Sequence, residues 1–122
     1  LTKIEVLTKI TAIIPTYNEE SNIKRALDSV GFADEIIVID SFSTDDTVSI
    51  VKKTSAILLQ REFDNFSDQK NFAISKASND LIFLLDADEI APKALQDEVL
   101  KIASSKESFS AYYIYRNYFF KT

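Results

Sequence analysis

Three carboxylates follow directly on a segment of large apolar residues. Asp86, Asp88 and Glu89 come immediately after residues 81–85, which read LIFLL. Five large apolar residues without polar alternation are typical of a strand buried on both faces, as in a parallel sheet. Residues two apart in an extended chain point the same way, so Asp86 and Asp88 can converge on one cation. Since carboxylate oxygens suit Mg²⁺ or Mn²⁺, the junction predicts a divalent-metal site at the ligand-binding end of a strand.

Two further strand-like segments end in polar residues. Residues 15–20 (PTYNEE) follow the apolar run 10–14, and residues 40–46 (DSFSTDD) follow the run 36–39. In a parallel sheet these ends lie on one edge, where acidic residues can hold a phosphate through a divalent cation. Asp40 is favoured as a ligand-binding residue, because an unpaired carboxylate after a buried run would be costly. Glu19 can instead serve as a charge at a helix N-terminus.

Composition excludes several classes of chemistry. The chain has 122 residues, no Cys, no His, one Gly and a net charge of −5. Without thiols or imidazoles it can form no disulfide, no thiolate metal site and no Ser-His or Cys-His nucleophile pair. A single Gly excludes both the P-loop and the G-x-G-x-x-G dinucleotide fingerprint. Because an acidic domain is a poor ligand for nucleic acid, we expect no nucleic-acid partner.

Strand-like and helix-like patterns alternate along the chain. We expect strands at residues 10–14, 36–39, 56–59, 81–85 and 109–120. Capping boxes at 16–19 and 43–46 predict the starts of two helices, and further helices are expected over 66–77 and from Pro92 to Ile102. This order predicts right-handed crossovers and a three-layer α/β/α domain with a mostly parallel sheet.

Three segments of the sequence resemble the family 2 glycosyltransferases. These segments are residues 14–20 (IPTYNEE), 38–47 (VIDSFSTDDT) and 85–89 (LDADE), and their order and spacing also match. Residues 66–73 (FSDQKNFA) resemble the family's helix before the D-x-D strand. The closest likeness is to the branch that includes lipopolysaccharide-core β-glucosyltransferases. The resemblance implies a Rossmann-like GT-A fold that binds a nucleotide-diphosphate sugar.

The resemblance also implies roles for individual residues. Tyr17 would lie against the base, Asp40 would bind the base edge, and Lys70 would help to hold the nucleotide. Asp88 would ligate Mg²⁺ or Mn²⁺ on the diphosphate, with Asp86 on the ribose or the metal. The residues implied to bind the donor nucleotide are Pro15, Tyr17, Glu19, Asp40, Lys70 and Asp86.

By the same resemblance, the full enzyme would transfer a hexose from a UDP-sugar, with inversion, to a glycan or lipopolysaccharide-core acceptor. It would work in the cytoplasm, at the inner face of the cytoplasmic membrane, as a peripheral protein. The family's general base lies downstream of the D-x-D motif, and no residue here fits that role, since Glu89 adjoins the metal site. We therefore expect a truncated GT-A domain over residues 1–122, with the acceptor-binding half absent.

Two other classes of protein stay open on the sequence alone. A non-catalytic nucleotide-binding or self-assembling module could keep this fold without turnover. Another α/β enzyme fits less well, because a nucleotidyltransferase usually carries a Gly- and Arg-rich loop after its first strand. Apolar residues on both faces of 109–120 predict an exposed strand, and hence a homo-oligomer formed through this aromatic tail.

Overall fold

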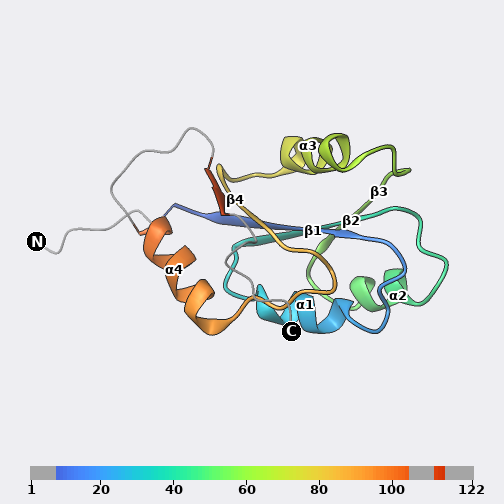
Figure 1. The fold of residues 1–122 in the computed structure, drawn as a ribbon, viewed down its shortest axis with the longest axis horizontal. Helices are drawn as coiled ribbons and strands as arrows, with labels where there is room; N and C mark the ends of the chain where they lie inside the picture. The colour runs from blue at the N-terminus through green and yellow to red at the C-terminus, as the bar shows by residue number, and fades with distance from the viewer. Residues whose placement is uncertain (1–7, 105–111, 115–122) are drawn as a thin grey trace, which may run out of the picture.

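The computed structural model describes residues 8–104 and 112–114 and shows one parallel sheet with helices on both faces (Figure 1). The sheet has five strands in the order β3-β2-β1-β4-β5, and every neighbouring pair is parallel. The predicted α/β fold with a mostly parallel sheet is therefore confirmed. The strands are β1 (Ile10–Thr16), β2 (Glu35–Asp40), β3 (Ile57–Gln60), β4 (Leu81–Leu84) and β5 (Tyr112–Ile114), and the helices are α1 (Ile23–Ser29), α2 (Thr47–Lys52), α3 (Phe66–Lys76) and α4 (Lys93–Ala103).

The sheet separates two layers of packed apolar side chains. Helix α3 lies on one face, and α1, α2 and α4 lie on the other (Figure 1). Alternate residues of β1 serve the two layers: Ile14 packs into the larger cluster with α1 and α4, and Ile13 packs into the smaller one beside α3. This alternation follows from the period of two in an extended strand. Burial on both faces explains why the central strands read as continuous apolar runs.

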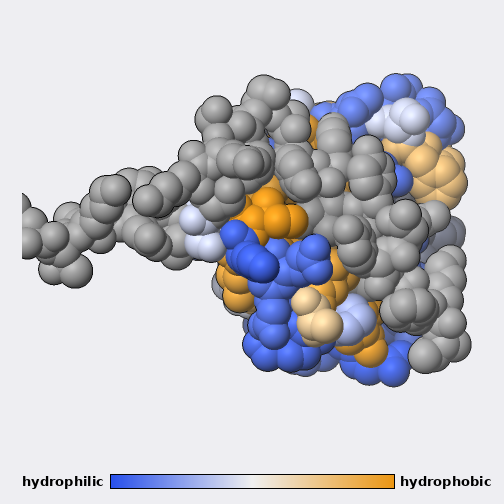
Figure 2. Space-filling model, turned by 60° about the vertical axis from the view of Figure 1, so that its left-hand side comes forward, coloured by the Kyte–Doolittle hydropathy of each residue, from blue (hydrophilic) through white to orange (hydrophobic). Residues whose placement is uncertain are grey.

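Helix α4 is amphipathic. Its buried residues are Leu95, Val99 and Ala103, and Lys93 forms an ion pair with Asp97 on the outer side, with Nζ and Oδ1 2.7 Å apart. Seen from the side on which α4 lies, the surface is a mixture of hydrophilic and smaller apolar areas (Figure 2). Within the part of the chain that the structure describes, no helix has both the length and the apolar character needed to cross a bilayer.

Both predicted capping boxes are wrong. Thr16 is the last residue of β1, its hydroxyl donates to the Ile14 carbonyl at 3.1 Å, and α1 begins only at Ile23. Helix α2 begins at Thr47 after Asp46, because the Ser43 hydroxyl donates instead to Asp40. In both segments the hydroxyl donates to a group two or three residues earlier in the chain, so it does not cap a helix.

The last predicted strand is described only in part. Residues 112–114 form β5, which pairs with β4 at the edge of the sheet. The rest of the segment 109–120, and with it the surface expected to form a homo-oligomer, lies outside the described residues.

Candidate functional site

The loops that follow β1, β2 and β4 meet the start of α3 around one cavity at the carboxyl edge of the sheet. Parallel pairing fixes this meeting, because Thr16 of β1 is in register with Asp40 of β2. The cavity has a volume of about 700 Å³, which lies in the range of small-molecule sites. Its lining residues are Pro15, Thr16, Tyr17, Glu19, Ser41, Phe63, Phe66, Gln69, Lys70, Asp86, Ala87 and Asp88.

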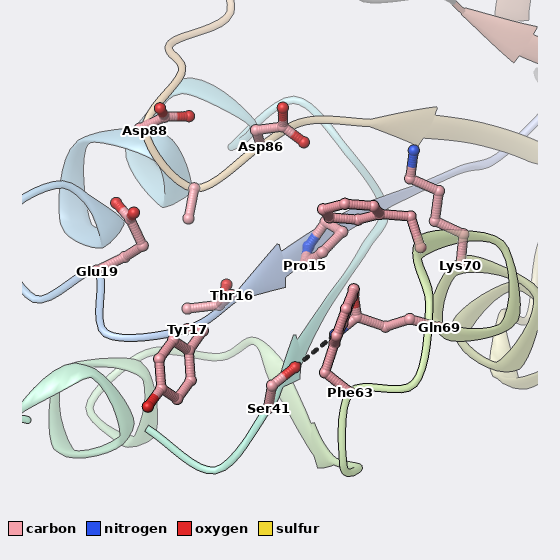
Figure 3. Close-up of a pocket in the computed structure, with 12 residues that line it drawn as sticks. Pro15, Thr16, Tyr17, Glu19, Ser41, Phe63, Gln69, Lys70, Asp86 and Asp88 are labelled. Atoms are coloured by element: carbon pink, nitrogen blue, oxygen red, sulfur yellow. Dashed lines mark hydrogen bonds between the residues drawn. The ribbon is translucent and has the colours of Figure 1, made fainter. Parts of the chain in front are cut away.

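One end of the cavity is acidic. Asp86 and Asp88 lie next to each other on the loop after β4, and Glu19 approaches from the loop after β1 (Figure 3). The loop after β4 is a tight turn, in which Glu89 N donates to the Asp86 carbonyl at 3.0 Å. The Asp86 N–H in turn donates to Oε1 of the buried Glu89 at 2.9 Å. Glu89 therefore shapes the turn that presents the two aspartates.

The carboxylates at this end suit a divalent cation that is shared with a bound phosphate. Carboxylate oxygens are the ligands that Mg²⁺ and Mn²⁺ prefer. Within residues 8–104, no group of three or more His, Cys, Asp or Glu side chains could hold a metal ion by itself. A cation held by one or two carboxylates and completed by substrate phosphates fits this donor set, and it is the usual arrangement for Mg²⁺.

The other end of the cavity is aromatic. Tyr17, Phe63 and Phe66 line it with 56%, 49% and 66% of their surface exposed. The Phe63 and Phe66 rings pack edge to face, with centroids 5.0 Å apart. Figure 3 shows Tyr17 and Phe63 on either side of Ser41, away from the acidic loop. No role was predicted for Phe63 or Phe66 from the sequence. The feature that could have indicated one is the pair of aromatic residues, three positions apart, at the start of a predicted helix.

Helix α3 contributes polar groups to the same cavity. Gln69 is 2% exposed, and its Nε2 donates to the Ser41 hydroxyl oxygen at 2.7 Å (Figure 3). Lys70, the next residue, also lines the cavity, and it lies across from Tyr17 and Glu19 (Figure 3). The helix is fixed at this end by its N-cap Asn65, whose side chain accepts from Asp68 N. One capped helix start therefore supplies a neutral amide and an ammonium group.

Asp40 does not line the cavity. It is fully buried at the end of β2, where its carboxylate accepts from Ser43 N at 2.9 Å and from the Ser43 hydroxyl at 2.5 Å. Gln60 Nε2 also donates to it, at 3.2 Å. The carboxylate is thus partnered inside the chain, so its burial does not require a bound ligand. Its role at the base edge stays a prediction.

A network of hydrogen bonds ties the loop after β1 to the loop after β2. Asn18 N donates to the Ser43 hydroxyl oxygen at 2.8 Å, and Asn18 Oδ1 accepts from Thr44 N at 2.8 Å. Asn18 and Phe42 have φ angles of 49° and 59°, in the left-handed region that Asn tolerates better than Phe. Both strained residues directly follow residues that line the cavity, which is where backbone strain is commonly stored.

Asp45 completes this network. Its carboxylate accepts from Thr47 N at 2.9 Å and from Glu20 N at 3.2 Å. Desolvation raises the pKa of Asp45, but the hydrogen bonds from Thr47 and Glu20 outweigh it and hold the pKa below its usual value. A carboxylate at this position therefore acts as a fixed anchor for both loops, and Tyr17 is positioned by the loop that it anchors.

The structure brings most of the predicted donor-binding residues together. The cavity is lined by Pro15, Tyr17, Glu19, Lys70, Asp86 and Asp88, whereas Asp40 is buried and does not line it. The remaining lining residues were not predicted from the sequence. These are Thr16, Ser41, Phe63, Phe66, Gln69 and Ala87.

Comparison with known proteins gives consistent results. Residues 11–119 match the model of the family described as Glycosyl transferase family 2. An uncharacterized glycosyltransferase of Rickettsia conorii, RC0292, is 43% identical over 109 residues, which is 87% of this chain and 39% of the relative. The chain thus spans about two fifths of the length of this relative.

Solved structures share the fold. Residues 1–349 of TarS from S. aureus superpose with a TM-score of 0.63 at 30% identity, covering 74% of this chain and 31% of that one. Glucosyl-3-phosphoglycerate synthase from Mycobacterium tuberculosis, in complex with Mn²⁺, uridine diphosphate and phosphoglyceric acid, gives a TM-score of 0.61 at 30% identity, covering 70% of this chain and 34% of that one.

The predicted likeness to lipopolysaccharide-core enzymes also has a counterpart. LpsC of Rhizobium meliloti, a lipopolysaccharide core biosynthesis glycosyltransferase, is 26% identical over 112 residues, which is 88% of this chain and 42% of the relative.

Proposed function

Because this chain belongs to glycosyl transferase family 2, we propose that its cavity binds the nucleotide diphosphate of a sugar donor through a divalent cation. The whole protein would transfer a hexose from a UDP-sugar, with inversion, to a glycan or glycolipid acceptor. The matched relative is about two and a half times as long as the part that this chain matches. We therefore expect the general base that activates the acceptor to lie outside the donor site.

One observation carries this proposal: the cavity has an acidic end and an aromatic end. Asp86 and Asp88 line one end, and Tyr17 and Phe63 line the other (Figure 3). A nucleoside diphosphate has the matching polarity, with a flat aromatic base at one end and a highly charged diphosphate at the other. Lys70 adds a positive charge to the lining of the cavity. The acidic residues can bind a phosphate only through a cation that lies between the two negative groups.

The metal would belong to the complex rather than to the protein alone. Asp88 would be its main protein ligand, with Asp86 on the metal or the ribose, and phosphate oxygens would complete the shell. When bound, such a cation neutralises the charge that develops on a diphosphate leaving group. A structural neighbour was solved with both Mn²⁺ and uridine diphosphate, which supports this choice of metal and nucleotide.

The acceptor and the setting of the reaction are proposed from one relative. The likeness to LpsC favours a lipopolysaccharide-core or related surface glycan as the acceptor. With such an acceptor, the protein would work in the cytoplasm, peripherally at the inner face of the membrane. A homo-oligomer formed through residues 109–120 remains part of the proposal, since that segment is rich in aromatic residues.

Calorimetric titration of UDP in the presence of Mn²⁺ tests the donor site. We expect binding by the wild-type chain, loss of most of that binding in EDTA, and at least tenfold weaker binding by Asp88→Ala. Asp97→Ala is the matched control, because it removes the same charge from the exposed face of α4, where an ion pair contributes little. Equal affinities of the wild type and Asp88→Ala would disprove the metal assignment.

A further inference from the structure

The segment that joins β4 to α4 carries both aspartates of the acidic end and then runs past α1 (Figure 1). Ala91, in this segment, is 2% exposed and packs into the larger apolar cluster. Side chains from two different helices bond both polar groups of its backbone. Ser29 Oγ of α1 accepts from Ala91 N at 3.0 Å, and Gln96 Nε2 of α4 donates to the Ala91 carbonyl at 2.8 Å. The segment is therefore held at Ala91 from two sides.

Ser29 is built into this contact. It is buried, and its hydroxyl donates to the Ala26 carbonyl at 2.8 Å while the oxygen accepts from Ala91 N. Both the donor and an acceptor position of the hydroxyl are thus used. A buried backbone N–H that loses its acceptor costs free energy, so without Ser29 Oγ the segment would be drawn toward water to satisfy Ala91 N.

The contact at Ala91 lies close to the acidic end of the cavity. Asp88 precedes Ala91 by three residues. Glu89 closes the turn around Asp88, because its Oε1 accepts from Asp86 N at 2.9 Å and its N donates to the Asp86 carbonyl at 3.0 Å. Only one residue separates Glu89 from Ala91. A shift at Ala91 therefore reaches the two aspartates through a short stretch of chain.

From these contacts we infer that Ser29 and Gln96 are positioning residues for the metal: with Glu89 they form a brace that holds Asp86 and Asp88 in place before the cation binds. The inference rests on the proposed function and deepens it. All three brace residues lie outside the lining of the cavity, so they act through the aspartates. A metal site with its ligands already in place loses little order on binding, which favours affinity.

Calorimetry on variants of the brace tests this inference. UDP with Mn²⁺, and uridine without metal, are titrated into the wild type, Ser29→Ala, Gln96→Ala and Glu89→Ala. We expect each variant to bind UDP with Mn²⁺ roughly tenfold more weakly, the lower end of the effect of groups that orient metal ligands. Uridine affinity should not change, because uridine has no phosphate to share a metal. A general loss of structure would weaken both ligands.

Thr54→Val is the matched control for Ser29→Ala. Thr54 Oγ1 makes the same pair of hydrogen bonds, since it donates to the Val51 carbonyl at 2.6 Å and accepts from Ala56 N at 3.2 Å. These bonds join the end of α2 to the start of β3 and not to the segment after β4, so UDP affinity should match the wild type. Thermal melting checks that each variant folds, and the half-buried Gln96 keeps the test available if Ser29→Ala does not fold.

A conservative variant separates positioning from other effects of Glu89. Glu89→Gln retains an oxygen that can accept from Asp86 N, and it should keep most of the affinity that Glu89→Ala loses.

Amide hydrogen exchange in the free protein tests the brace without any ligand. Slow exchange is expected at Ala91 N, which is buried and bonded to Ser29. In Ser29→Ala, exchange should become faster at Ala91 and also at Asp86 and Glu89, because the segment opens as one unit.

The outcomes distinguish the brace from the donor site. If the wild type binds UDP with Mn²⁺ and the three alanine variants bind it equally well, the brace is wrong and the donor site stands. Equal losses for UDP and uridine, equal losses for Glu89→Gln and Glu89→Ala, or faster exchange at Ala91 alone would also overturn the inference. If the wild type does not bind UDP with Mn²⁺, the proposed function fails and the inference fails with it.

Discussion

Replacing Asp40 by alanine is expected to destabilise the chain by about 3 kcal/mol, because its buried carboxylate holds the loop after β2. The carboxylate is fully buried and accepts two hydrogen bonds from Ser43, from N at 2.9 Å and from Oγ at 2.5 Å. Hydrogen bonds to a charged group contribute about 1.5–3 kcal/mol each. We take the lower value for each, because removing the carboxylate also relieves its own desolvation.

The effect should be visible in equilibrium unfolding. Urea titration followed by circular dichroism gives the change in free energy of unfolding, and about 3 kcal/mol corresponds to a fall in melting temperature of roughly 10–20 °C for a domain of this size. Asp88→Ala is the matched control, since it removes an exposed carboxylate and should change stability by less than about 0.5 kcal/mol.

A double-mutant cycle with Ser43→Ala isolates the contact. The Ser43 hydroxyl connects Asn18 N to Asp40, so the two substitutions should be coupled by about 1 kcal/mol or more. A loss of less than about 1 kcal/mol for Asp40→Ala, or strict additivity with Ser43→Ala, would refute this account of Asp40 as the anchor of the loop after β2.

Two further predictions concern charged groups at opposite edges of the sheet. Partial burial raises the pKa of Glu35, but hydrogen bonds from Ser78 and Thr11 outweigh this effect and lower the pKa below 4.5. The unfolded chain therefore binds more protons at Glu35 than the folded chain does. As a result, stability falls as the pH drops below about 4.5. Glu35→Gln should remove that part of the decline in urea midpoints measured between pH 3 and 6, and an unchanged profile would contradict the assignment. Lys70→Ala should weaken UDP roughly tenfold and uridine hardly at all in calorimetry, because an ammonium interacts with the diphosphate rather than the base, whereas Lys70→Arg should retain binding. An equal loss of affinity for UDP and for uridine would show that Lys70 does not interact with the diphosphate.

The order of elements and the acidic end of the cavity could be predicted from the sequence. The apolar run 81–85 followed by Asp86 and Asp88 identifies a buried strand and its polar end without knowledge of the fold. Parallel pairing then brings the ends of β1, β2 and β4 to one edge, so the meeting of Tyr17 with these aspartates follows from topology. These inferences depend on periodicity and on the chirality of crossovers, which are strong signals.

The helix starts and the aromatic end of the cavity could not be predicted. The hydroxyls of Thr16 and Ser43 looked like helix caps, but they donate to the Ile14 carbonyl and the Asp40 carboxylate, which precede them by two and three residues. No role could be predicted for Phe63, because nothing in the sequence shows that the segment after β3 turns toward the cavity. A sequence pattern does not show which of several nearby polar groups a hydroxyl will bond, nor where a loop lies in the folded chain.

The central claim is that the cavity binds a nucleotide diphosphate through a divalent cation. Its most direct test is a crystal structure from crystals grown with UDP and Mn²⁺, in which anomalous diffraction locates the metal. We expect an anomalous peak at a metal ion bonded to Asp88 and to the diphosphate, with the base lying at the aromatic end of the cavity between Tyr17 and Phe63. Anomalous density away from the loop after β4, or UDP bound with its base toward Asp86 and Asp88, would contradict it.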